Sequence, residues 1–181
     1  EQGAFLGFGV VIDADGVIAS DSNALGENAD AYIVSHDGTK VRAFVTARTA
    51  GTGVAFLQTA TSSEGKPLVW KPAAIATKKV TLGQSVIAFS GKSISRIASG
   101  IVTALIPRGD EGSRIDVIDT SIPGETTFPG TPVANVDGEI VGMSTGISRG
   151  SSLSGYIPSS ALIRSAPVDA LRNRRRGLLH E

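Results

Sequence analysis

Hydroxyl side chains are concentrated in one loop, directly before a pair of apolar strands. Residues 118–142 read IDTSIPGETTFPGTPVANVDGEIVG, and the second half alternates apolar residues around the turn Asp137-Gly138. Asp-Gly between apolar runs predicts a hairpin, because Gly tolerates the positive φ that such turns need. A loop of Gly, Pro, Ser and Thr that leads into a buried hairpin is where many all-β hydrolases hold their nucleophile. The candidate hydroxyls are those of Thr120, Ser121, Thr126, Thr127 and Thr131.

A hydroxyl nucleophile needs a base beside it, and the chain offers few. Of its two histidines, His36 lies in the predicted turn SHDGTK and His180 is next to the last residue. Two isolated histidines predict neither a catalytic base nor a metal site. Lys92 is the remaining candidate base for a loop hydroxyl. The alternative, which we favour, is that these hydroxyls bond to the backbone of their own turns.

Acidic and sulfur-containing side chains do not predict a metal site either. Four aspartates form close pairs in the sequence, but their spacing does not resemble a calcium loop. They are Asp13 with Asp15, and Asp116 with Asp119. The chain has no cysteine, which excludes disulfides and cysteine-ligated metals. We therefore expect neither a metal nor a cofactor.

The overall charge argues against two classes of partner. Lysine plus arginine and aspartate plus glutamate each number 17 in the 181 residues, so the formal net charge is zero. This balance does not favour nucleic acid or anionic lipid as a partner. No stretch approaches the roughly 18 apolar residues that span a bilayer, so we expect no membrane insertion. The opening EQGAFLGFGVV predicts a strand and not a signal peptide, so we expect the full protein to extend before residue 1.

Strand patterns and turn signals fill most of the chain. GFGVVIDADGVIAS, AYIVSHDGTKVRAFVTAR and GVAFLQTA predict a first β-lobe over residues 1–60. The polar stretch 61–74 predicts a linker, in which we expect Trp70 to cover apolar surface. SVIAFSG, RIASGIVTALIPR, RIDVIDTS, the hairpin and SGYIPSS predict a second lobe over residues 75–158. The spacing is that of a β-barrel or sandwich.

A helix-length amphipathic pattern first occurs at Ser159 or Ser160, which are good N-cap residue types. The predicted helix covers residues 159–177, and Pro167 is expected to kink it or to begin a second segment. Its end, before Gly177 as a C-cap, carries Arg172, Arg174, Arg175 and Arg176. These arginines could bind an acidic partner, but we favour solvated cations that stabilise the helix C-terminus, because no aromatic residue interleaves them.

Four collinear motifs resemble the HtrA-type (DegP-like) serine proteases. GFGVVIDADGVIAS is similar to that family's N-terminal strand pair, and LGQSVIAFSG with SGIVTALIPR to the strands that open its second barrel. PVANVDGEIVGMSTG is similar to the strands after its nucleophile, and GYIPSSALI to its strand-to-helix exit. The resemblance implies one all-β domain over residues 1–181, a trypsin-like double six-stranded β-barrel with a C-terminal helix. The family's PDZ modules are not in this chain.

The resemblance also implies where a Ser-His-Asp triad should lie, and each position can be read directly. The histidine position in IASDSNAL is Asn23, the aspartate position in TGVAFLQ is Gly53, and the nucleophile position in TTFPGTP is Pro129. An amide cannot relay a proton near neutral pH, and glycine supplies no carboxylate. Proline has neither a hydroxyl nor an N–H for an oxyanion hole. Loss of a triad costs on the order of 10⁶ in turnover.

The sequence therefore predicts a pseudoprotease that binds a protein or peptide as a scaffold or regulatory domain. An extended peptide could add to the old substrate groove, whose candidate residues are Phe128, Pro129, Gly130, Ser144, Thr145 and Gly146. Alternatively, Phe128 and Pro129 fill the groove and the useful surface lies elsewhere. The competing hypothesis is a residual hydrolase that uses a hydroxyl of residues 120–131. The resemblance also favours an extracytoplasmic location (periplasmic, secreted or membrane-tethered) and allows a homo-oligomer.

Overall fold

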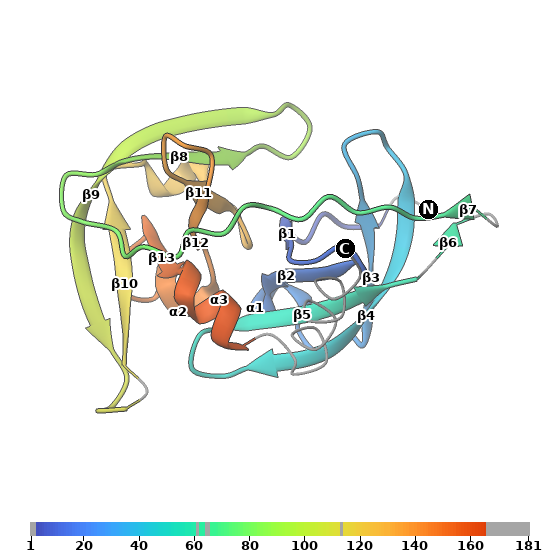
Figure 1. The fold of residues 1–181 in the computed structure, drawn as a ribbon, viewed down its shortest axis with the longest axis horizontal. Coiled ribbons are helices and arrows are strands. Elements are labelled where there is room, and N and C mark those ends of the chain that lie inside the picture. Colours follow the sequence, from blue (N-terminus) through green and yellow to red (C-terminus); the bar gives the residue numbers. More distant parts are fainter. Residues whose placement is uncertain (1–2, 61, 64–65, 113, 166–181) are drawn as a thin grey trace, which may run out of the picture.

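β-Hairpins with Asp-Gly turns build the first lobe (Figure 1). The structure is a computed structural model that describes residues 3–60, 62–63, 66–112 and 114–165. Five strands form an antiparallel sheet in the order β1-β2-β5-β4-β3. They are β1 (Gly9–Val11), β2 (Val17–Asp21), β3 (Asp30–Val34), β4 (Lys40–Thr49) and β5 (Val54–Thr59). Gly16 and Gly38 have φ angles of 87° and 84°, which explains why glycine follows aspartate in both turns.

The second lobe is a closed barrel in the order β10-β13-β12-β11-β8-β9. Its strands are β8 (Ser85–Ser90), β9 (Arg96–Arg108), β10 (Ile115–Thr120), β11 (Pro132–Ala134), β12 (Ile140–Met143) and β13 (Gly155–Pro158). β11 and β12 pair antiparallel across the turn Asp137-Gly138, as the sequence predicted. Val86, Val102, Ile118 and Tyr156 fill the barrel interior.

The all-β class and the two lobes are confirmed, but the first lobe departs from the expected six-stranded barrel. In the described residues it has five strands, and β1 and β3 are its edges. The residues before β1 bond to the second lobe and do not close the sheet. Phe8 donates its backbone N–H to the carbonyl of Pro129 at 2.8 Å.

The segment between the lobes hydrogen-bonds to both of them. β6 (Ser62–Ser63) and β7 (Lys66–Pro67) form a two-stranded ribbon. Farther on, Ala73 donates to the carbonyl of Val11 at 2.9 Å, and Ile140 donates to the carbonyl of Ala74 at 2.7 Å. Trp70 packs against an apolar cluster of the first lobe, in agreement with the predicted cover.

Short helices occur before Ser159, where the sequence patterns predicted none. They are α1 (Ser22–Leu25), the 3-10 turn η1 (Gly124–Thr126) and α2 (Gly146–Arg149). Each is about one turn long, too short to leave an amphipathic pattern in the sequence. α3 (Ser159–Ser165) begins where predicted, while Pro167 and the four arginines lie outside the described residues. No helix in the described part is long and apolar enough to cross a membrane.

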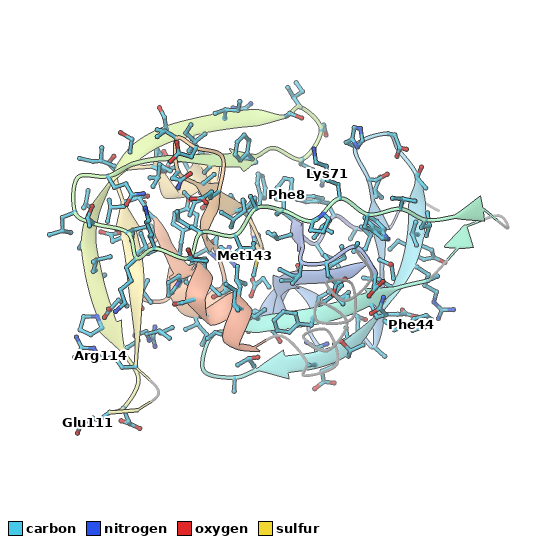
Figure 2. The ribbon with its side chains drawn as sticks, viewed as in Figure 1. Phe8, Phe44, Lys71, Glu111, Arg114 and Met143 are labelled. Carbon is cyan, nitrogen blue, oxygen red and sulfur yellow. The ribbon has the colours of Figure 1, made fainter. Side chains whose placement is uncertain are left out.

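One apolar cluster contains residues of both lobes. Phe56 and Val54 of β5 belong to it together with Met143 of β12 and Leu162 of α3, and all four side chains are fully buried. Figure 2 shows Met143 in the central region of the molecule, between the two sheets. The α1 and α2 turns meet beside this shared core, and their contacts define the candidate site.

Candidate functional site

A buried carboxylate joins the two lobes at the site. Asp21 ends β2, has 0% of its surface exposed, and accepts a hydrogen bond from the Asn23 N–H at 3.2 Å as the N-cap of α1. It also accepts one from the N–H of Gly146 in the second lobe at 3.0 Å. Its other oxygen forms an ion pair with Arg149 at 3.1 Å. One side chain thus holds three groups, one in the first lobe and two in the second.

The α2 turn has its own side-chain caps. Thr145 accepts a hydrogen bond from the Ser148 N–H, and the Ser148 hydroxyl accepts one from the Thr145 N–H, which makes a reciprocal capping box. The Thr145 hydroxyl donates to the carbonyl of Thr52 in the first lobe at 2.9 Å. Thr145 and Ser148 are fully buried. These bonds hold the chain in a helical turn directly after β12.

Two positions that the sequence singled out, Asn23 and Gly53, both contact this turn. A Cβ built on Gly146 would lie 2.1 Å from the Asn23 side-chain nitrogen, so the amide packs on the glycine. A Cβ built on Gly53 would lie 2.9 Å from a side-chain carbon of Ile147. Gly53 also has a φ of 70°, which disfavours any residue with a side chain. The space between these positions is filled by the α2 turn.

The third position, Pro129, lies in a loop that is covered by the N-terminal segment. The backbone N–H of Phe8 donates to the Pro129 carbonyl. The neighbouring Phe128 packs edge-on against Phe5, with the ring centroids 5.6 Å apart. Phe8 lies near both rings, 5.4 Å from Phe5 and 6.3 Å from Phe128, and is labelled in Figure 2. A Cβ on Gly130 would come within 2.0 Å of the Phe8 carbonyl oxygen, so only glycine allows this approach.

Every backbone N–H of the loop from residue 127 to residue 131 is already used. Thr127 donates to the Gly124 carbonyl at 3.2 Å, Gly130 to the Ser144 carbonyl at 2.8 Å and Thr131 to the Phe128 carbonyl at 3.0 Å. Phe128 donates to the Thr131 hydroxyl at 2.9 Å, and Pro129 has no N–H. The loop therefore offers no donor to an oxyanion.

The sequence matches a known family of protein domains. A family model of the trypsin-like peptidase domain matches residues 7–143, well over half of the chain. The chain belongs to the trypsin-like peptidase domain family. The sequence-based resemblance is thus confirmed at the level of the trypsin-like family.

Solved structures share the trypsin-like fold. The crystal structure of Deg5 matches with a TM-score of 0.68 at 20% sequence identity. The match covers 86% of this chain and 79% of the Deg5 chain. The MamO protease domain from Magnetospirillum magneticum, in its apo form, matches with a TM-score of 0.62 at 17% sequence identity. The match covers 88% of this chain and 87% of the MamO chain. Among curated proteins, no match was found. At these identities the two structures establish the fold alone.

The candidate hydroxyls of this trypsin-like chain all bond to nearby polar groups. Thr126 donates to the Pro123 carbonyl at 2.7 Å and Thr127 to the Gly124 carbonyl at 2.9 Å. Thr120 donates to the Ser154 carbonyl at 3.3 Å, Ser121 accepts from the Ile101 N–H at 3.0 Å, and Thr131 accepts from Phe128. Lys92 lies exposed in the turn between β8 and β9 and, within the described residues, bonds to none of them. The arrangement matches turn hydroxyls better than a nucleophile with its base.

The groove segment Ser144–Gly146 also has its backbone groups occupied. Ser144 donates to the Thr131 carbonyl at 2.9 Å and accepts from Gly130. The Thr145 carbonyl accepts from the Arg149 N–H at 3.0 Å, and the Gly146 carbonyl from the Gly150 N–H at 3.1 Å. With the Thr145 and Gly146 N–H groups bound to Ser148 and Asp21, no free strand edge is left here for an extended peptide.

The remaining candidates have local structural roles. Asp13 accepts from the N–H groups of Asp15 and Val17 at 3.0 and 3.1 Å and so shapes the first turn. Asp119 accepts from the hydroxyls of Thr103 and Ser152, and Asp116 pairs with Arg114 at 3.6 Å. His36 is exposed in its turn, and His180 lies outside the described residues. In the described residues, no group of three or more His, Cys, Asp or Glu side chains is placed to hold a metal.

The sequence reasoning missed the pair Asp21 and Arg149. They are 128 positions apart, and neither stands in a motif that points to the other. One signal existed in part: Asp is a good N-cap type, and Asp21 directly precedes the α1 turn.

Proposed function

We propose that this chain is a non-catalytic member of the trypsin-like peptidase family that acts by binding protein, as a scaffold or regulatory domain. The observation that carries the proposal is Pro129 at the nucleophile position, in a loop whose backbone donors are all used. A serine-type mechanism needs a hydroxyl, a proton acceptor and a stabilised oxyanion. The residues at Asn23, Gly53 and Pro129 supply none of these.

The occupied backbone of Ser144–Gly146 bears on how such a domain would bind. Substrate-like binding would require this segment to exchange hydrogen bonds with an extended peptide. Releasing Gly146 for that purpose would break its bond to the buried Asp21 carboxylate. We therefore favour a binding surface outside the old groove, and we assign the groove region a role in holding the lobes together.

Labelling with a fluorophosphonate probe and incubation with an unfolded protein substrate test the non-catalytic part. We expect no labelling and no cleavage by the full chain, with an active trypsin-like protease as positive control. The triple variant Asn23→His, Gly53→Asp, Pro129→Ser is expected to stay inactive, because the Thr127 and Phe128 donors remain bound. Labelling that disappears in Thr126→Ala or Thr127→Ala would instead support the residual hydrolase.

The binding part is tested by affinity capture from the native source, followed by titration of any captured protein in isolation. We expect saturable binding that the groove variant Phe128→Ala leaves unchanged. The surface control is Val69→Ala, in the segment between the lobes, where the side chain is 91% exposed. Loss of binding in Phe128→Ala but not in the surface control would show that the partner binds in the old groove. Absence of any saturable partner would contradict the proposed function.

A further inference from the structure

The edge of the first lobe at β3 presents unpaired backbone groups. Ala29 accepts from the Val45 N–H at 2.8 Å and Ser35 donates to Thr39 at 3.0 Å, so the odd-numbered residues of this strand bond to β4. In an antiparallel pair the intervening residues direct N–H and C=O to the opposite side. These residues are Asp30, Tyr32 and Val34. Among the described residues, no other segment forms a hydrogen bond with their outward-facing backbone groups.

After Asp30, the exposed side chains of this edge are the aromatic Tyr32 and the apolar Val34. Tyr32 and Val34 are 60% and 64% exposed, and Phe44 beside them on β4 is 46% exposed. β3 contains no proline and no lysine, and no bulge interrupts its pairing with β4. Proline, lysine and bulges are the features by which edge strands avoid pairing with another chain. β3 carries a single charge, that of Asp30 at its first residue, so the rest of the strand is open to strand addition.

Charges on the edge are arranged so that it complements itself. Asp30 lies at one end of β3, and Lys40 pairs with Val34 at the other end, with its amine 4.5 Å from the centre of the Tyr32 ring. In an antiparallel pairing of two β3 strands about Tyr32, Asp30 of each copy lies opposite Val34 of the other. Asp30 then lies on the same face as Lys40 of the other copy, with Val34 of that copy between their backbones, and the long lysine side chain can reach across to the carboxylate. A two-fold axis repeats this contact, as an isologous interface requires.

We propose that a second copy of this chain docks on the β3 edge, so that the two five-stranded sheets form one sheet across a two-fold axis. The three outward-facing residues of each strand pair as Asp30 with Val34, Tyr32 with Tyr32, and Val34 with Asp30, and each pair exchanges two backbone hydrogen bonds. The aromatic pair and the two Asp30–Lys40 contacts lie on the same face. Asp30 also binds Arg42 within its own chain, but 38% of its side chain stays exposed to receive Lys40.

The expected dimer is weak and depends on concentration. One pair of short strands with a few side chains falls in the size class of transient interfaces. The inference does not depend on the catalytic state of the site, because β3 lies at the end of the first lobe away from the closed barrel (Figure 1). It specifies one interaction surface and one partner.

Charge-reversal variants of the full chain, studied by sedimentation equilibrium over a concentration series, test the proposal. Asp30→Lys alone and Lys40→Glu alone should each weaken the dimer about tenfold, because both symmetric contacts become repulsive. An equimolar mixture of the two variants should regain the affinity of the unchanged chain, because each contact again joins opposite charges. Equal weakening in the mixture would refute the proposed register.

Backbone pairing is tested by Tyr32→Pro, which removes an N–H that points to the edge and leaves the β3–β4 bonds intact. We expect this variant to be folded by circular dichroism and monomeric. The matched control is Glu111→Lys, which reverses a charge at the tip of the β9–β10 hairpin, far from β3 in Figure 2. A chain that stays monomeric up to its solubility limit, or a dimer that Tyr32→Pro does not affect, would overturn the proposal.

Discussion

Replacement of Asp21 by alanine removes a buried carboxylate that joins the two lobes. Two N–H groups, of Asn23 and Gly146, lose their acceptor, and a buried donor without a partner costs about 1–3 kcal/mol. Arg149 loses its counter-ion, although its side chain is 29% exposed and water can solvate part of the charge. Removal of one partner of a buried pair costs about 3–5 kcal/mol. Because of the partial exposure we expect the lower end, about 3 kcal/mol.

Urea unfolding followed by circular dichroism measures this loss. For a chain of this size, about 3 kcal/mol corresponds to a fall of about 6–12 °C in Tm. Asp21→Asn keeps one oxygen acceptor and should lose less, about 1–2 kcal/mol. The control Asp137→Ala, at an exposed turn, should stay within about 0.5 kcal/mol of the original chain.

A double-mutant cycle separates the ion pair from the rest of the effect. Asp21→Asn and Arg149→Leu should be less than additive, with a coupling of about 1 kcal/mol or more. The reasoning would be refuted if the coupling were zero, or if Asp21→Ala were as stable as Asp137→Ala.

Three further predictions concern other described residues. Gly53→Ala should lower the free energy of unfolding in urea by about 1–3 kcal/mol, because Gly53 has a positive φ and lies close to the α2 turn. The control Gly51→Ala, with nothing within 4 Å of its Cβ, should not lower it, and equal losses in the two variants would contradict this. Tyr156→Phe should unfold at the same or a higher temperature, since burial raises the pKa of Tyr156 and its buried hydroxyl has no partner among the described residues; a clear loss of stability would show that the hydroxyl is bonded. Hydrogen bonds from the Ser35 hydroxyl and the Thr39 N–H lower the pKa of Asp37 from 3.8 to about 2. The ionised carboxylate therefore favours the folded state above about pH 4, and this contribution is lost as the pH falls toward 2. An NMR titration of Asp37 should show a midpoint at about pH 2, and Ser35→Ala should raise that midpoint.

Local signals were enough to predict the strands and hairpins. Each of the three Asp-Gly turns joins two antiparallel strands in the structure, because positive φ at glycine and apolar alternation act over a few residues. The C-terminal helix begins at Ser159 as predicted. The open first lobe could not be predicted, because it depends on the N-terminal segment bonding to Pro129, more than a hundred residues away.

The positions of the candidate site could be proposed from the sequence, but their contacts could not. Asn23, Gly53 and Pro129 could be found from the spacing of motifs along the chain, since the family places them relative to neighbouring strands. The Asp21–Arg149 pair and the use of every loop N–H depend on how a one-turn helix and a tight loop fold. Sequence alone carries no signal for such contacts between distant segments.

The glycine at position 53 has a consequence for the evolution of this domain. If the proposed non-catalytic function holds, a route to peptidase activity that begins at Gly53 must place a side chain where φ is 70° and Ile147 occupies the space. A route that begins with Pro129→Ser supplies a hydroxyl and one N–H, but the other donors of the loop stay bound and Asn23 offers no base. The first of these changes costs stability and the second supplies no base, so neither alone is expected to give turnover. Under the proposed function, the fold therefore makes a change to a peptidase in single steps difficult.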